Sequence, residues 1–127
     1  MSKDLYEEGL RLRREVVGKD KVDSWNESAD EFTAPLERLT TEVGWGAIWS
    51  RPGLERKTRS LLTLVLLAAQ HRDEELEIHL HNAVRNGCTH EEIREALLHT
   101  MAYCGIPTAR HAAKLASRVL GTSAEKR

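Results

Sequence analysis

A nine-residue apolar run, LLTLVLLAA at residues 61–69, limits the architecture of this chain more than any other segment. The run is apolar nearly all round a helix, which is typical of a helix covered by neighbours on every side. We therefore expect a central helix over residues 55–72. The run is too short to span a bilayer, and the N-terminus, MSKDLYEEGLRLRRE, lacks the apolar stretch of a signal peptide. The sequence thus predicts a soluble cytoplasmic protein with no membrane partner.

The rest of the chain favours helices as well. Leu, Ala, Glu and Arg dominate, aromatic residues make up 5%, and there is neither a Val/Ile/Thr alternation nor an Asn-Gly or Asp-Gly hairpin turn. A chain of 127 residues has the size of one domain. We therefore predict an all-α fold of about six helices in a single domain over residues 1–127.

Capping and breaking residues suggest where these helices begin and end. Thr89 and Glu92 form a T-x-x-E capping box, Asp73 is an expected N-cap, and glycines at 44 and 46 are expected to end a helix that Pro35 starts. An N-terminal helix within residues 1–20 is expected at the surface or at an interface, and residues 122–127 form a polar tail. The predicted helices cover residues 5–17, 35–43, 55–72, 73–86, 89–105 and 107–121.

Charge and cysteine content exclude several classes of protein. Lys and Arg number 19 against 20 Asp and Glu, so no uncompensated basic field exists to hold nucleic acid. The two cysteines, Cys88 and Cys104, are too few for a disulfide scaffold and are expected to be reduced. Cys104 as a nucleophile has no partner fixed by spacing, and packing is the simpler interpretation.

The most suggestive polar pattern is a stripe on the helix predicted at 73–86. At 100° per residue, Glu75, His79, Asn82 and Asn86 fall on one narrow stripe beside the apolar face. A carboxylate one turn from a histidine can fix its tautomer and keep it basic enough to move protons near neutral pH. The alternative is an exposed i,i+4 pair on a solvated helix.

Other candidate groups are less specific. His79 and His81 diverge by about 200° on a helix, so the histidines do not predict a metal site. Arg51 and Arg59 lie around the turn before the central helix, where guanidinium groups can clamp carboxylates. Trp45 and Trp49 can line a small pocket, although a core or subunit contact explains them equally well.

Four strings in order make the sequence recognisable: GWGAIWSRPGL, RSLLTL, EELEIHLHNAVRNGCTHEEIREALLH and AYCGIPTARHA. They resemble the carboxymuconolactone decarboxylase family, a branch of the alkyl-hydroperoxidase D-like superfamily, over roughly residues 6–120. The resemblance implies a small helical bundle, assembled as a homohexamer, with no cofactor. Redox members of the superfamily carry C-x-x-C-x-x-x-H, whereas this chain has Arg72 and Glu75 at the cysteine positions and keeps His79. Dithiol chemistry is therefore not expected.

The reaction implied by the resemblance is loss of CO2 from 4-carboxymuconolactone, giving 3-oxoadipate enol-lactone in protocatechuate breakdown. Such a reaction needs cations for the substrate's carboxylates, a donor near the developing enolate oxygen and an acid for the ring carbon. On this hypothesis His79 is the acid, Glu75 orients it, and Arg51 and Arg59 contact the carboxylates or the enolate.

Further expectations complete this hypothesis. Tyr103 is a second candidate donor, and apolar walls from Trp45 and Trp49 would exclude water from the substrate. Three alternatives remain open at this point: the same scaffold acting on another lactone or keto acid, a thiol peroxidase or redox partner, and a noncatalytic helical assembly protein.

Overall fold

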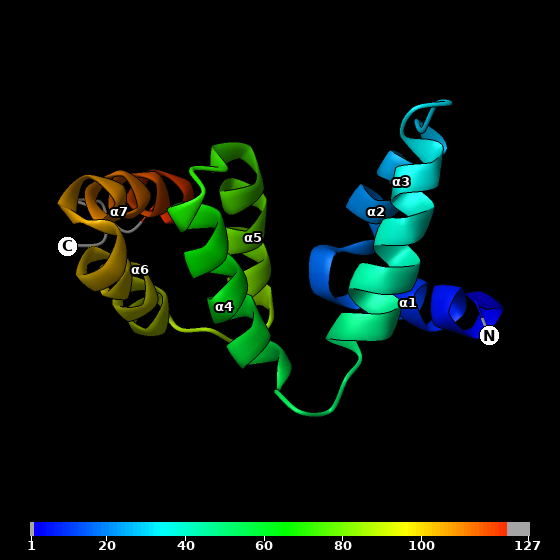
Figure 1. Ribbon diagram of the computed structural model, residues 1–127, viewed down its shortest axis with the longest axis horizontal. Coiled ribbons are helices and arrows are strands. Elements are labelled where there is room, and N and C mark those ends of the chain that lie inside the picture. Colours follow the sequence, from blue (N-terminus) through cyan, green and yellow to red (C-terminus); the bar gives the residue numbers. More distant parts are fainter. Residues whose placement is uncertain (1, 122–127) are drawn as a thin grey trace. The chain divides into compact units, whose positions relative to one another are not determined.

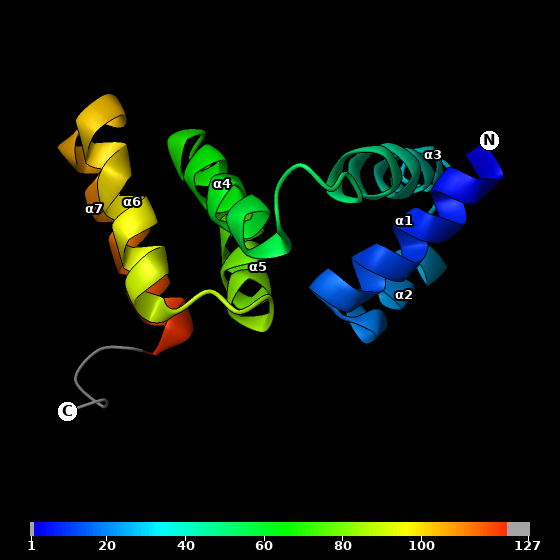
Figure 2. The same cartoon turned by 90° about the horizontal axis from the view of Figure 1, so that it is seen from below.

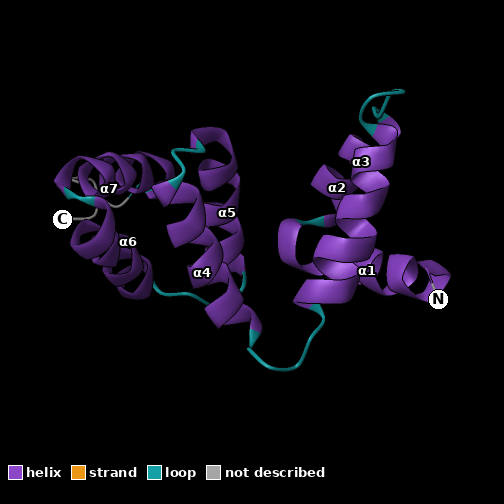
Figure 3. Ribbon diagram, viewed as in Figure 1, coloured by secondary structure: helices purple, strands orange, loops and turns teal. Residues whose placement is uncertain are grey.

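The computed structural model describes residues 2–121, so the polar tail at 122–127 lies outside the described residues. Every element within this range is helical, with seven α-helices and one π-helix (Figure 3). The all-α prediction is therefore confirmed for the described chain, with two more elements than the predicted six. None of the described helices is both long and apolar enough to cross a membrane.

The described chain forms two compact units that divide between Leu54 and Glu55, each with its own apolar core. We call them unit 1 and unit 2. The first holds helices α1 (Ser2–Val17), α2 (Lys19–Glu27) and α3 (Ala34–Leu39), followed by the π-helix η1 (Thr40–Trp49). Helix α2 was not expected, because its sequence is short and polar, and it contributes the buried Val22 to the core. The prediction of one domain over residues 1–127 stays a prediction.

Unit 1 is organised by close packing of α1 against η1 (Figure 1). The expectation that Gly44 and Gly46 end a helix is wrong, because the helical path continues through both as a π-helix. A Cβ on Gly46 would overlap the backbone carbonyl of Leu5, and one on Gly9 would overlap that of Thr41. These two glycines therefore serve a close approach of two backbones, which local sequence patterns do not reveal.

Substituting Gly9 by Ala tests this contact. We expect Gly9→Ala to lower the free energy of unfolding by about 1–3 kcal/mol, because the added methyl group meets backbone that moves only if a whole helix shifts. Gly44→Ala is the matched control, since nothing lies within 4 Å of its added Cβ. That variant should be neutral, or more stable by up to about 1 kcal/mol through helix propensity. Urea unfolding followed by circular dichroism measures both, and equal destabilisation of the two variants would contradict the close approach.

A buried arginine completes the core of unit 1. Arg13 is 5% exposed, forms an ion pair with Glu37 at 2.9 Å and donates a hydrogen bond to Thr41 Oγ1 at 3.1 Å. Its guanidinium group also lies 5.2 Å from the centroid of the Trp25 ring. Arg13 thus ties α1 to α2, α3 and η1, since a buried charge needs such partners.

Unit 2 consists of α4 (Arg56–Ala69), α5 (Asp73–Arg85), α6 (His90–Cys104) and α7 (Ile106–Leu120). Helices α4 and α5 lie side by side, as do α6 and α7, and both pairs contribute to one core (Figures 1 and 2). The capping box at the start of α6 is confirmed, because the side chains of Thr89 and Glu92 each accept a hydrogen bond from the other's backbone N–H. Asp73 is the first residue of α5 and makes no cap; its carboxylate instead contacts His111 Nε2 at 2.8 Å.

Helix α4 is covered on one face only, so the expectation of burial on every side is wrong for the single chain. Leu64 and Ala68 are buried in the core, whereas Leu62 and Leu66 are 46% and 60% exposed. Leu62 and Leu66 are therefore not covered by any other described part of unit 2.

The helix ends at a turn in which His71 adopts a φ of 58°, a left-handed conformation that is uncommon outside glycine.

Candidate functional site

The polar stripe predicted on α5 exists, and it runs from an exposed end to a buried one. Glu75 is exposed at the start of the helix, His79 is half-buried, and Asn82 is 3% exposed. One turn further, the amide Nδ2 of Asn86 donates a hydrogen bond of 2.9 Å to Ser60 Oγ on α4. The adjacent face of α5, which includes Leu76, is packed into the core of unit 2 and holds the stripe in place.

The environment of His79 sets its protonation state. Its side chain is 17% exposed, and burial lowers the pKa from the ordinary 6.5 to about 4. The imidazole is therefore neutral at pH 7. This differs from the expectation that Glu75 keeps the ring basic, because that carboxylate is largely in water while the ring is not.

Both ring nitrogens of His79 have a polar neighbour. Glu75 Oε1 lies 3.9 Å from Nε2, a distance at which the charges interact but no hydrogen bond forms. On the other side, Asn82 Nδ2 lies 3.4 Å from Nδ1, within the range of a long hydrogen bond. Sequence reasoning put Asn82 on the stripe but assigned it no role. The three-residue spacing was the available signal, since i and i+3 side chains meet on a helix.

The predicted residues Trp45, Trp49 and Arg51 belong to unit 1. The two tryptophan rings pack with centroids 4.7 Å apart and planes tilted by 32°. Trp45 lies in the apolar core of the unit, which agrees with the core alternative, and Trp49 is half-buried against that core. Arg51 is exposed just after η1. A role of these three in substrate binding stays a prediction.

Arg59 and Tyr103 belong to unit 2, with the Glu75 and His79 pair. Arg59 is half-buried in the first turn of α4, and its backbone carbonyl accepts a hydrogen bond of 2.8 Å from Thr63 Oγ1. Tyr103 lies near the end of α6, is 82% exposed, and has its ring 5.4 Å from that of His99. Substrate contacts at both positions stay predictions.

The cysteines are both free thiols, as expected. Cys88 is buried, its Sγ lies 3.5 Å from the backbone carbonyl oxygen of Lys57, and burial raises the pKa of this thiol, which disfavours a nucleophilic thiolate. Cys104 is exposed at the end of α6 and is not the packing residue that was expected. Among residues 2–121, no group of three or more His, Cys, Asp or Glu side chains is arranged to hold a metal ion.

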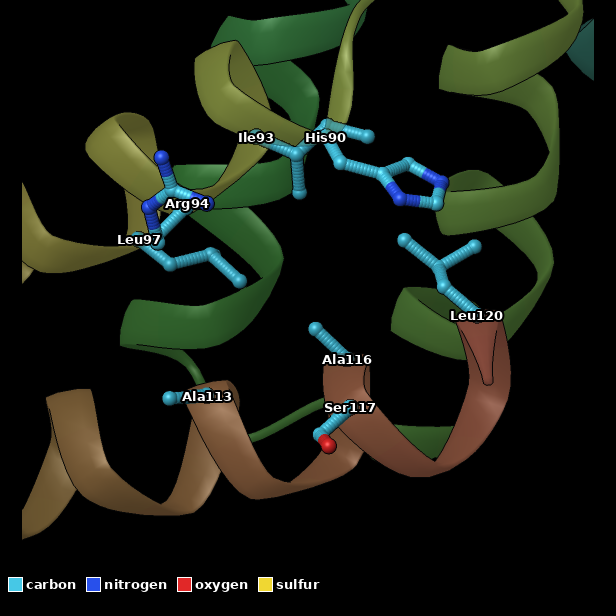
Figure 4. A pocket seen from close by; sticks show the side chains of 8 residues that line it. All are labelled: His90, Ile93, Arg94, Leu97, Ala113, Ala116, Ser117 and Leu120. Carbon is cyan, nitrogen blue, oxygen red and sulfur yellow. The ribbon is translucent and has the colours of Figure 1, made fainter. Parts of the chain in front are cut away.

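An open cavity of about 220 Å³ lies between α6 and α7 (Figure 4). Its polar lining side chains are His90, Arg94 and Ser117. Its apolar lining residues are Ile93, Leu97, Ala113, Ala116 and Leu120. None of the predicted site residues lines this cavity, so it is separate from the α5 stripe.

Comparison with known proteins identifies the family of this chain. The sequence pattern of the carboxymuconolactone decarboxylase family matches residues 34–118. A nitrosuccinic acid decarboxylase of Metarhizium robertsii is 42% identical over 96% of this chain and 85% of its own length. A 4-carboxymuconolactone decarboxylase of Acinetobacter baylyi is 39% identical over 95% of this chain and 92% of its own length. The chain belongs to the carboxymuconolactone decarboxylase family.

Proposed function

We propose that this protein is a cofactor-free decarboxylase that converts 4-carboxymuconolactone to 3-oxoadipate enol-lactone. The family match and the two decarboxylase relatives support a carboxy-lyase. The observation that carries the proposal is His79, a shielded neutral imidazole whose Nε2 faces the exposed end of the α5 stripe. Such a group can stabilise a developing negative charge without a cofactor.

The names of the two relatives point to one type of chemistry. 4-Carboxymuconolactone loses CO2 from a carbon that is conjugated, through the ring double bond, to the lactone carbonyl. Nitrosuccinic acid can lose CO2 from the carbon that bears the nitro group. In both cases the electron pair of the broken C–C bond moves onto oxygen, as an enolate or a nitronate, and a proton then adds to carbon. A single donor aimed at that oxygen serves both reactions.

Neutral His79 fits the role of this donor better than that of the acid. An imidazole with a pKa of about 4 holds almost no second proton at pH 7, so an imidazolium acid is scarce in the free protein. A neutral imidazole N–H can still donate to an oxyanion, and triosephosphate isomerase is the standard example of this use. We assign His79 to the developing enolate oxygen. Glu75, at the exposed end of the stripe, orients the ring through its charge near Nε2, and the ring carbon takes its proton from solvent water.

The arginines provide the contacts for the substrate's two carboxylates. We expect Arg59→Ala to lower kcat/KM by about 10–100-fold, the effect of removing a hydrogen bond to a charged group. Arg51→Ala should act in the same direction. Arg94→Ala is the control, because this arginine is exposed on α6 and lines the separate cavity. Steady-state kinetics measures all three variants, and unchanged kcat/KM for both Arg51→Ala and Arg59→Ala would refute the carboxylate contacts.

The function is tested by an ultraviolet assay with 4-carboxymuconolactone generated enzymatically in the cuvette. Turnover should persist with a chelator present and should be matched by CO2 release. Nitrosuccinate is the second candidate substrate, favoured by the relative at 42% identity, and is assayed in parallel. A higher kcat/KM for nitrosuccinate would move the assignment to that acid, and no turnover of either by folded protein would refute the proposed function.

Assembly of the chain into a homohexamer is part of the proposal. The N-terminal helix, expected at the surface or at an interface, does not offer its apolar side chains for this, because Leu12 and Val16 are buried within unit 1. Another apolar row supports it instead: Leu36 and Leu39 on α3 and Val43 on η1 are each more than half exposed, and so is Phe32 in the turn before α3.

Light scattering coupled to gel filtration measures the assembly. We expect a mass of about 86 kDa, six times the 14.4 kDa of one chain, in the closed symmetry usual for such assemblies. Leu36→Glu should lower this mass, because it places a charge in the apolar row. Glu31→Gln is the control at a neighbouring exposed position. A monomer at all concentrations would contradict the hexamer.

A further inference from the structure

We propose that Asn82 is a positioning residue that holds His79 in the tautomer with its proton on Nε2. The inference deepens the proposed function and rests on it, because it specifies which ring atom donates to the substrate. Both residues are on α5, three residues apart, and Asn82 is 3% exposed. Their contact therefore does not depend on the conformation of a loop. A helix with a buried face fixes such a pair within narrow limits.

Nδ1 of His79 has the side-chain amide of Asn82 as its neighbour. A neutral imidazole has one nitrogen that donates and one that accepts. Asn82 Nδ2 lies 3.4 Å from Nδ1 and can donate to it, which requires that Nδ1 carry no proton. The buried amide gains a partner by this contact, and a buried polar group without a partner destabilises the folded state.

Nε2 of His79 lies on the opposite side of the ring. Glu75 Oε1 lies 3.9 Å from this atom. A carboxylate attracts an N–H and repels a nitrogen lone pair, so its field favours a proton on Nε2. The groups at both ends of the ring therefore select the same tautomer. The NH2 group of Asn82 towards the ring is the amide orientation that fits the tautomer favoured by Glu75.

The chemical consequence is a donor of fixed position. With Nδ1 occupied by the Asn82 amide, the N–H of His79 is on the side of the ring that faces Glu75 and the exposed end of the stripe. The other tautomer would present a lone pair there, which repels an enolate or nitronate oxygen. Asn82 thus acts through His79 and does not contact the substrate.

The tautomer is measured by 15N NMR of the full-length protein labelled at histidine, at pH 7 and without substrate. In the wild type we expect His79 to show a protonated Nε2 and an unprotonated Nδ1 that accepts a hydrogen bond. A predominant Nδ1–H form would overturn the proposal. This measurement needs no variant, so it remains decisive even if substitutions of the buried Asn82 impair folding.

Two variants then test the cause. Asn82→Asp replaces the donor by an acceptor and should move the proton to Nδ1, while Asn82→Leu removes the contact and should leave a mixture of tautomers. Asn86→Asp is the matched control, because the same change one turn further along α5 alters a contact with Ser60 and leaves the His79 signals as in the wild type. Unchanged His79 signals in both Asn82 variants would overturn the proposal.

Kinetics separates this inference from the proposed function. We expect Asn82→Asp to lower kcat by about 10–100-fold, the span typical of groups that orient a functional histidine, with little change in KM. An unchanged kcat together with a shifted tautomer would overturn the positioning role. If the spectra are as expected and the wild type decarboxylates neither substrate, the proposed function fails while the assignment of the tautomer stands.

Discussion

Replacing His79 by leucine should lower kcat by about 10²–10³-fold, the usual cost of losing one donor to a developing oxyanion. Leucine fills a similar volume, so the half-buried position on α5 should tolerate it. His79→Gln should lose less, because its amide still offers an N–H donor. His81→Gln is the control: His81 is on the same helix but exposed. Single-turnover kinetics on the preferred substrate measures the chemical step directly.

The pair of variants also separates the two possible roles of His79. If an imidazolium acid were required, glutamine would be as inactive as leucine, and kcat/KM would fall as the pH rises above the low pKa of the ring. For a neutral donor, kcat/KM should be flat near neutrality and fall only as the pH approaches 4, where His79 takes up its second proton. Equal loss in both variants would return His79 to the acid role.

The features of the fold that could be predicted from the sequence are those fixed by residues close together in the chain. The capping box of Thr89 and Glu92 lies within four residues, and the structure confirms it. The π-helix through Gly44 and Gly46 could not be predicted in this way. Local patterns interpret its glycines as helix breakers. Position 46 needs a glycine for another reason: the backbone of Leu5, on a helix far away in the sequence, lies too close to leave room for a Cβ. Close approach of two helices is a tertiary property that no local window contains.

The candidate site shows the same division. Helical periodicity placed Glu75, His79 and Asn82 on one stripe, and the contacts at 3.9 and 3.4 Å bear this out. Periodicity did not reveal which of them would be buried. Burial of His79 lowers its pKa, which disfavours the acid role expected of this histidine. Asn82 is the neighbour within hydrogen-bonding distance of the ring. The chemistry of the stripe therefore follows from packing as much as from spacing.

The protein should lose more stability in acid than its His79→Gln variant does. The pKa of His79 is about 4 in the folded protein and 6.5 ordinarily, so between these values the unfolded chain binds a proton that the folded chain does not. Above pH 6.5 this difference has no effect. As the pH falls from 6.5 to 4, the free energy of unfolding of the wild type should decrease by about 3 kcal/mol from this group, and below pH 4 the loss stays constant.

Urea unfolding at pH 7 and pH 4, at one fixed protein concentration, measures the difference. Carboxylates also titrate in this interval, but they are common to both proteins, so the gap between the two pH dependences isolates His79. His81→Gln is the control and should follow the wild type, because His81 is exposed on the same helix. Parallel pH dependences of the wild type and His79→Gln would show that the ring takes up its proton in the folded state. That result would refute the lowered pKa of His79 from which the neutral donor of the proposed mechanism is argued.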